Sequence, residues 1–265
     1  MTNDRELRAL QRVAQGLLGR HLSDDALRGA RNALSNGAEY IVIPLLWLVA
    51  TPILVARLGT ETYGLLMIVG TLMGFEGLLS LGLTDATTRY VAKYRTTGRA
   101  HEIEHVIRVS LTLYGGLGIG AALLVNALAP FLAETVFKTG TARTAEVILA
   151  IRLGGIGLGV RFIESLLRSA IYGLERHDLA ARIGMATRIL TMTGNVILVL
   201  AGLGLVAVLT NMIVLLALNA FALGIVLRRF LVPGLNLSPT LRLKKSRRMI
   251  GFGVWSWLRT VATTI

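Results

Sequence analysis

Long uncharged apolar runs constrain this chain more than any other feature. Three of them, at residues 40–56, 109–133 and 189–227, contain no Asp, Glu, Lys or Arg. The last run has 39 residues, and a single helix of that length, rising about 1.5 Å per residue, would be roughly 60 Å long. A bilayer core is only about 30 Å thick. The run therefore predicts two membrane spans joined by a tight turn, which we place at Gly202-Leu203-Gly204.

The composition also favours a membrane protein. Charged residues make up 16% of the chain and hydrophobic residues 54%, whereas an average soluble domain has about 25% charged residues. We predict an all-α polytopic transmembrane helix bundle, made of a six-helix lobe plus the start of a seventh span. The predicted spans are 38–56, 64–83, 107–130, 146–167, 185–203 and 206–227, and the seventh begins near 250.

These spans divide the chain into four segments. They are a cytoplasmic amphipathic N-terminal segment at 1–37, the transmembrane lobe at 38–227, a basic cytoplasmic linker at 228–249, and the start of a second lobe at 250–265. The last segment is too short to cross a bilayer. We therefore expect the sequence to be a fragment of a longer protein or a truncated reading frame.

Basic residues alternate sharply between successive connections. Twenty of the 28 Lys and Arg residues fall in the N-terminal segment and in the second, fourth and sixth connections, against three in the first, third and fifth. Cytoplasmic loops are the ones enriched in Lys and Arg. We predict a cytoplasmic N-terminus, and we expect no nucleic-acid partner, because the net charge of +13 reflects topology.

Charged residues inside spans are costly, at least about 2.5–3.5 kcal/mol each, so each needs a partner or a wet cavity. Arg161 and Glu164 share one face of the fourth predicted span, which also contains Arg152, and Arg188 lies one turn inside the fifth. Arg161 and Glu164 form either a self-neutralised pair or part of a cationic cavity lining. The candidate substrate-binding residues are Arg152, Arg161, Glu164 and Arg188.

Glu76 lies in the second predicted span and has no partner nearby in the sequence. A protonatable carboxylate at that depth suits ion coupling, although a carboxyl that joins two helices would explain it equally well. Glycines four residues apart (Gly70/Gly74, Gly116/Gly120 and Gly155/Gly159) are expected to let helices approach closely.

No pattern indicates catalysis, a cofactor or a metal site. The chain has no Cys, and its four His residues lie outside the predicted spans. None of them pairs with carboxylates at a metal-ligand spacing, and no Ser-His-Asp or paired-carboxylate arrangement stands out. We therefore expect a protein that is not an enzyme.

Three stretches resemble a known family. They are RLGTETYGL at 57–65, LGL at 81–83 leading into RYVAKYR at 89–95, and YGLERHDL at 172–179 followed by GLGL at 202–205. In this order the set resembles the polysaccharide exporter (O-antigen flippase) branch of the multidrug/oligosaccharidyl-lipid/polysaccharide exporter superfamily, over roughly residues 30–260.

The resemblance implies two pseudo-symmetric six-helix lobes around a cationic cavity, of which this chain provides the first. It also implies alternating access and an undecaprenyl-diphosphate-linked oligosaccharide as substrate. The lipid bilayer and other polysaccharide assembly proteins would be its further partners. Glu76 stands where an apolar or aromatic residue is expected, so the resemblance assigns it no role.

Three alternatives to a lipid-linked oligosaccharide flippase stay open. A cation-coupled multidrug exporter of the same superfamily would be expected to line its cavity with carboxylates, whereas the deep charges here are two arginines and two glutamates. A membrane-embedded glycosyl- or phospho-transferase would need clustered carboxylates for a metal. The third alternative is a scaffold for polysaccharide assembly.

Overall fold

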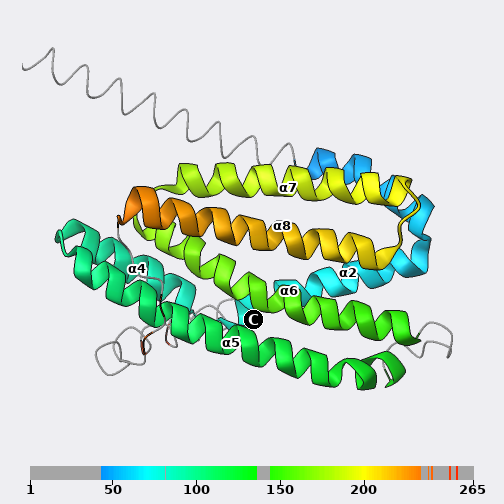
Figure 1. The fold of residues 1–265 in the computed structure, drawn as a ribbon, viewed down its shortest axis with the longest axis horizontal. Coiled ribbons are helices and arrows are strands. Elements are labelled where there is room, and N and C mark those ends of the chain that lie inside the picture. Colours follow the sequence, from blue (N-terminus) through cyan, green and yellow to red (C-terminus); the bar gives the residue numbers. More distant parts are fainter. Residues whose placement is uncertain are drawn as a thin grey trace, which may run out of the picture. The chain divides into compact units, whose positions relative to one another are not determined.

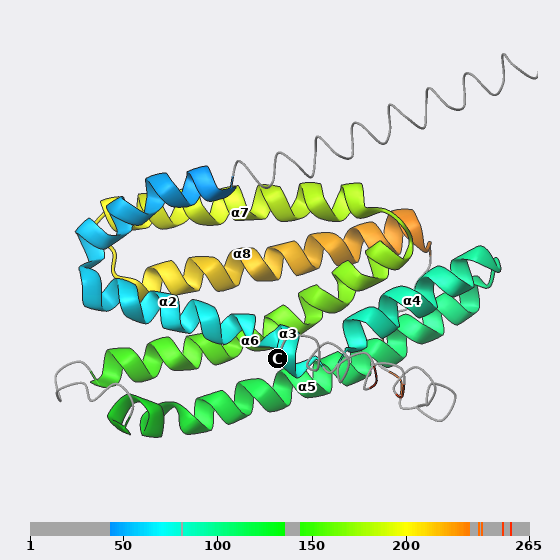
Figure 2. The ribbon, with the colours of Figure 1, turned by 180° about the vertical axis from the view of Figure 1, so that it is seen from behind.

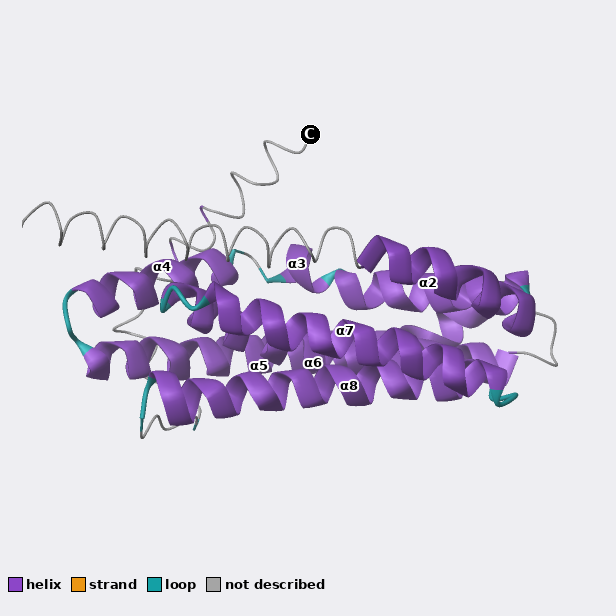
Figure 3. Ribbon diagram, turned by 90° about the horizontal axis from the view of Figure 1, so that it is seen from above, coloured by secondary structure: helices purple, strands orange, loops and turns teal. Residues whose placement is uncertain are grey.

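The computed structural model describes residues 43–80, 82–135 and 144–233, together with positions 238, 240, 251 and 255. All regular elements in these ranges are helices, which confirms the all-α prediction (Figure 3). In order, they are the helix Ile43–Leu58, α2 Thr60–Gly74, α3 Glu76–Leu79, α4 Leu83–Thr96, α5 Ala100–Thr135, α6 Thr144–Gly173, α7 His177–Leu200, α8 Leu205–Val226 and the π-helical turn η1 Leu227–Leu231. The predicted N-terminal segment and most of the linker and second-lobe segment lie outside the described residues.

Four helical stretches are long and apolar enough to cross a membrane: Thr60–Leu79, Ala100–Thr135, His177–Leu200 and Leu205–Leu231. They coincide with the second, third, fifth and sixth predicted spans. The fourth predicted span corresponds to α6, which is 30 residues long but carries several charges. The first corresponds to the shorter apolar helix Ile43–Leu58. The length and composition of these helices show that the chain is a multi-pass membrane protein.

Large apolar side chains on these helices point outward. The exposed fraction is 71% for Leu48, 66% for Leu123 and 67% for Phe221. Along α8, Val214, Leu218, Phe221 and Ile225 are all exposed, and their three- and four-residue steps place them on one face. Soluble monomers rarely expose apolar patches of this extent, whereas lipid tails would cover them at no cost.

Connections between the long helices alternate between the two ends of the bundle (Figures 1 and 2). At one end, Gly202 has φ 80°, a conformation that glycine adopts without steric cost, and α7 turns into α8. The turn predicted at Gly202–Gly204 is therefore confirmed. The opposite end holds the α4–α5 and α6–α7 turns, with Arg99 and Arg176. The two ends thus differ in basic charge, while their orientation in the membrane stays a prediction.

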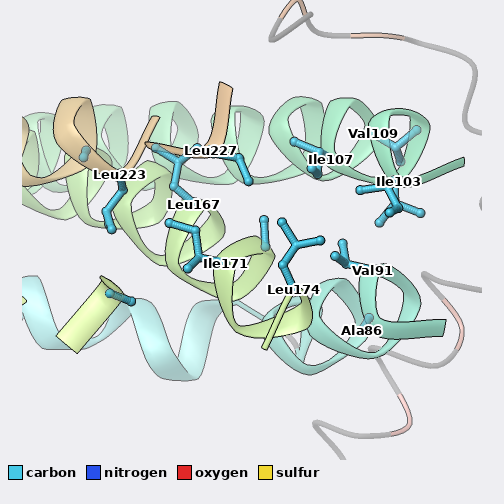
Figure 4. Packing of buried hydrophobic residues seen from close by; sticks show 14 residues of the cluster. Ala86, Val91, Ile103, Ile107, Val109, Leu167, Ile171, Leu174, Leu223 and Leu227 are labelled. Atoms are coloured by element: carbon cyan, nitrogen blue, oxygen red, sulfur yellow. The ribbon is translucent and has the colours of Figure 1, made fainter. Parts of the chain in front are cut away.

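Helix α6 lies at the centre of the packing and contacts α2, α4, α5, α7 and α8. One hydrophobic cluster joins α6 to α4, α5 and α8 through Val91, Ile107, Ile171 and Leu223, which are fully buried (Figure 4). A second cluster brings the helix Ile43–Leu58 against α2, α6, α7 and α8. Among the charged side chains of α6, this packing buries Glu164 most completely.

The second predicted span, 64–83, overlaps the stretch Thr60–Leu79 but ends four residues earlier than predicted, and it is interrupted. The helix breaks at Phe75, whose N–H bonds to the Leu72 carbonyl three residues back. The short helix α3 then ends at Leu79, and α4 begins at Leu83. Gly74 and Gly77 flank the break, and glycine weakens a helix by about 1 kcal/mol relative to alanine. Glu76 is the first residue after the break.

Helices approach each other closely at one of the three expected glycine pairs, Gly155/Gly159. They also do so at Gly118, which was not expected. A Cβ at Gly155 would lie 2.8 Å from Asn126 Nδ2, and one at Gly159 would lie 3.3 Å from the Gly118 carbonyl oxygen. The expectation is wrong for Gly70/Gly74 and Gly116/Gly120, where no atom of the described chain lies within 4 Å of an added Cβ.

Two stretches that are distant in the sequence, RYVAKYR at 89–95 and YGLERHDL at 172–179, meet at one end of the bundle. Arg95 Nη1 lies 2.5 Å from Glu175 Oε2, and the Thr88 hydroxyl donates to the Ser169 carbonyl at 3.2 Å. A Cβ at Gly173 would lie 2.7 Å from both the Thr88 carbonyl oxygen and Val91 Cβ. Glycine at 173 is therefore what allows α4 to lie against α6.

We expect Gly173→Ala to lower the stability of the protein by about 1–3 kcal/mol, because the added methyl group overpacks the α4–α6 contact. The measurement is the thermal melting temperature of the purified protein in detergent. Gly116→Ala is the matched control, since that glycine is helical and has open space around it. Equal melting temperatures for the two variants would contradict the close approach of α4 and α6.

Candidate functional site

A buried carboxylate on α6 is the centre of the candidate site. Glu164 is 1% exposed, and its Oε1 accepts a hydrogen bond of 2.8 Å from Arg168 Nε and a second bond from Arg168 Nη2. Its Oε2 lies 3.4 Å from Arg161 Nη1. The three residues are three and four positions apart, so the helical repeat alone places them on one face. The predicted pairing of Arg161 with Glu164 is confirmed.

A second helix contributes Asn219. Its Nδ2 on α8 donates to Glu164 Oε1 at 3.2 Å, and this contact is buried. Asn219 Oδ1 is also buried and has no hydrogen-bond partner among the described residues. Glu164 thus links α6 to α8 as well as holding two arginines. We call Arg161, Glu164, Arg168 and Asn219 the Glu164 cluster.

The two arginines of the Glu164 cluster differ in exposure. The side chain of Arg168 is 21% exposed and makes the close contacts, whereas that of Arg161 is 41% exposed and makes the longer one. A guanidinium has five N–H donors in a planar fork, more than one carboxylate oxygen can use. Arg161 is therefore the member of the cluster that is best placed to meet an anion from outside.

Glu76 lies beside this cluster, at the break that begins α3. Only 8% of its surface is exposed. Ser165, Arg161 and Glu164, all on α6, are near enough to its carboxyl group to affect it electrostatically. Its Oε1 is buried without a hydrogen-bond partner in the described part of the chain. An unpaired buried oxygen of this kind costs about 1–3 kcal/mol or more, so this atom of Glu76 does not contribute to the stability of the fold.

Hydroxyl groups form a polar layer between α4 and α5. The Tyr114 and Thr84 hydroxyls lie 2.8 Å apart, and those of Thr87 and Ser110 lie 2.9 Å apart. Tyr114 also interacts with the charge of Glu76. The layer satisfies polar groups that would otherwise face hydrocarbon.

The other two candidate residues do not extend the cluster along α6. Arg152 is exposed and lies nine residues before Arg161, which corresponds to about 14 Å along the helix axis and the opposite face. Its carbonyl oxygen accepts a hydrogen bond of 3.5 Å from Asn126. Arg188 has an exposed side chain on α7.

Sequence reasoning did not include Asn219 or Arg168 among the candidate site residues. Arg168 could have been found, because it lies four residues after Glu164 on the same helical face. Asn219 carried no such signal, since asparagines also occur at 126, 195 and 211. Two of these form a different contact, in which Asn211 Nδ2 donates to Asn195 Oδ1 at 2.8 Å and joins α7 to α8.

A second polar feature lies at the start of α5, where two residues of the predicted linker contact the helix. Arg108 Nε donates to the Ser238 carbonyl at 3.0 Å, and the Thr112 hydroxyl donates to the Thr240 carbonyl at 2.9 Å. Beside them is a cavity of about 260 Å³ lined by His101, Glu104, His105, Arg108 and Thr240. These contacts hold part of the segment after α8 against α5.

A family model described as "Polysaccharide biosynthesis protein" matches residues 30–265. No curated protein and no solved structure gives a significant match. In the ranges that the structure describes, no group of three or more His, Cys, Asp or Glu residues could hold a metal ion.

Proposed function

We propose, because the chain belongs to the polysaccharide biosynthesis protein family, that it is the N-terminal lobe of a flippase for lipid-linked oligosaccharides. In this proposal the substrate is an undecaprenyl-diphosphate-linked oligosaccharide, and the membrane is the bacterial cytoplasmic membrane. The N-terminus is cytoplasmic. The family includes exporters and its members are typically transporters.

The observation that supports this proposal most directly is the partly exposed guanidinium of Arg161 inside the helix bundle. A diphosphate headgroup carries about two negative charges, and its passage through a low-dielectric path requires fixed cations. Arginine suits this role because its planar fork matches phosphate oxygens and its charge persists at any physiological pH. Glu164 pairs with Arg161, and the Arg161 side chain stays 41% exposed.

The helical arrangement is compatible with alternating access. In transporters built from two related lobes, substrate sites lie near the bilayer midplane at the lobe interface, and rocking of the lobes exposes the site to each side in turn. The break at Phe75 adds a discontinuous helix beside Arg161, and irregular backbone at membrane depth occurs where it is buried in protein or lines a cavity. Arg161 and Glu76 would face that cavity.

A cation-coupled drug exporter is the second candidate, and the buried Glu76 is the observation that favours it. Organic cations would be attracted by a carboxylate rather than by Arg161. A flippase would thus meet its substrate through Arg161, whereas a drug exporter would meet its substrate through Glu76.

The test is disruption of the complete gene in its host, followed by measurement of surface glycan and of lipid-linked oligosaccharide on each membrane leaflet. A flippase predicts loss of surface glycan, with the finished lipid-linked oligosaccharide accumulating on the cytoplasmic leaflet. Complementation with the full-length gene should restore both. Normal surface glycan together with increased drug sensitivity would support the exporter instead, and an unfinished lipid-linked intermediate would indicate a transferase.

A further inference from the structure

Two residues of the linker are bonded to α5 mainly through their backbones. Arg108 Nε donates to the Ser238 carbonyl at 3.0 Å, and its Nη2 donates to the Ser238 hydroxyl at 3.1 Å. The Thr112 hydroxyl accepts from the Thr240 N–H at 2.8 Å and donates to the Thr240 carbonyl at 2.9 Å. Three of these four bonds involve backbone atoms of the linker. They therefore hold the path of the chain and depend little on the side chains that the linker carries.

The spacing of the two bonded pairs matches. Arg108 and Thr112 are four residues apart, which is about 6 Å along a helix axis. Ser238 and Thr240 are two residues apart, which spans at most about 7 Å. Both pairs therefore form together when the linker runs along α5. Glu104 Oε1 lies 3.6 Å from Arg108 Nη1, so the guanidinium is held on this face of α5 and loses less conformational freedom when it bonds to the linker.

The linker also contacts the bundle nearer to α8. Leu231 and Val232, at the end of η1, pack against the hydrophobic cluster that includes Ile107 of α5. The chain is thus attached beside α5 where it leaves α8, and it is attached to α5 again at Ser238 and Thr240. Two successive attachments favour a docked linker over one that crosses α5 at a single point.

These attachments limit where the next helix can begin. Positions 251 and 255 are helical, and both belong to the predicted second lobe. Along a fully extended chain, Gly251 could lie up to about 65 Å from Val232 but only about 37 Å from Thr240. Fixing Thr240 on α5 therefore shortens this reach by almost half, and it ties the start of the second lobe to α5 rather than to α8.

We propose that Arg108 and Thr112 form a docking surface for the linker, and that this surface sets the position of the second lobe relative to α5. The partner that fits the surface is a segment of this same chain. The inference rests on the proposed function only in assuming that a second lobe follows. Because substrate sites of two-lobe transporters lie at the lobe interface, the docking also bears on what faces Arg161.

The first experiment tests the docking by disulfide trapping in the full-length protein, in native membranes and with any other cysteine replaced. The residues of this chain include no Cys. Thr112→Cys/Thr240→Cys should form a disulfide at least about tenfold faster than Ile119→Cys/Thr240→Cys, because only the first pair lies within disulfide reach. Ile119 is 65% exposed and lies on the same face, about 10 Å further along α5. Equal rates for the two pairs would overturn the docking.

The second experiment measures the position of the second lobe by electron spin resonance between labels at Arg182→Cys and Trp255→Cys. Both positions have exposed side chains, one on α7 and one in the predicted second lobe. Arg108→Met/Thr112→Val removes the bonding groups and nearly keeps the side-chain volumes. We expect this variant to broaden the distance distribution about twofold, in line with the longer reach of an undocked linker. An unchanged width would show that the docking does not position the second lobe.

Thr210→Val is the matched control for the second experiment. The Thr210 hydroxyl is exposed and bonds to the Val206 carbonyl of its own helix, so its loss should leave the distribution at the wild-type width. Should the double variant fail to fold, Thr112→Val alone provides the test, because it removes two of the four bonds at constant shape. An unchanged distribution in that variant would overturn the proposal equally.

Both experiments are independent of transport, which separates this inference from the proposed function. Rapid disulfide formation between positions 112 and 240, in a protein whose loss leaves surface glycan normal, would keep the docking and refute the flippase. Slow disulfide formation in a protein whose loss abolishes surface glycan would refute the docking and keep the flippase.

Discussion

Replacing Glu164 by alanine should destabilise the protein strongly. The substitution leaves the Arg168 guanidinium largely buried without a counter-charge, and it also removes the acceptor of Asn219. Breaking a buried ion pair from one side costs about 3–5 kcal/mol. We expect Glu164→Ala to reduce the amount of folded protein in the membrane severalfold and to lower its melting temperature strongly.

The matched control is Glu175→Ala. Glu175 is also a glutamate paired with an arginine, but its side chain is 64% exposed, and exposed ion pairs contribute about 0–1 kcal/mol. The double variant Glu164→Leu/Arg168→Met should recover part of the lost stability, because it leaves one fewer unpaired charge inside the bundle. If the melting temperatures of the Glu164→Ala and Glu175→Ala variants lie within about a degree of each other, the Glu164 cluster does not stabilise the protein.

Replacing Arg161 by alanine should abolish surface polysaccharide while leaving membrane abundance nearly unchanged. Glu164 keeps its contacts with Arg168 and Asn219 in this variant, so little stability is lost. Arg161→Lys should restore only part of the function, since lysine retains the charge but not the bidentate fork. The measurement is surface glycan in a complementation assay with the full-length gene, together with protein quantified in the membrane fraction.

Arg182→Ala is the control for this prediction, because Arg182 has an exposed side chain on α7 and lies outside the proposed site. It should leave surface glycan at the wild-type level. Arg152→Ala tests the remaining deep arginine of α6, and its position on the opposite face predicts a smaller effect than that of Arg161→Ala. Normal glycan from both the Arg152 and the Arg161 variants would exclude the proposed electrostatic role of these two arginines.

Local patterns in the sequence determined the helices and part of the site. An uncharged run too long for one span required a turn, and Gly202–Gly204 was the place where the backbone could make it. Spacings of three and four residues placed Arg161, Glu164 and Arg168 on one face before any neighbour was known, because the helical repeat is a property of the backbone. Alternating basic charge predicted two chemically different ends of the bundle.

Only the tertiary structure decided which helices meet these faces. The rotation and axial position of α8 bring Asn219 to Glu164, and those of α3 bring Glu76 to Ser165 and Arg161. Close packing of α5 on α6 occurs at Gly118 rather than at Gly116 or Gly120, although all three glycines lie within one short stretch. Such contacts depend on how side chains of two helices interlock along their whole length. That fit involves residues from distant parts of the chain, and no periodicity within one helix reports it.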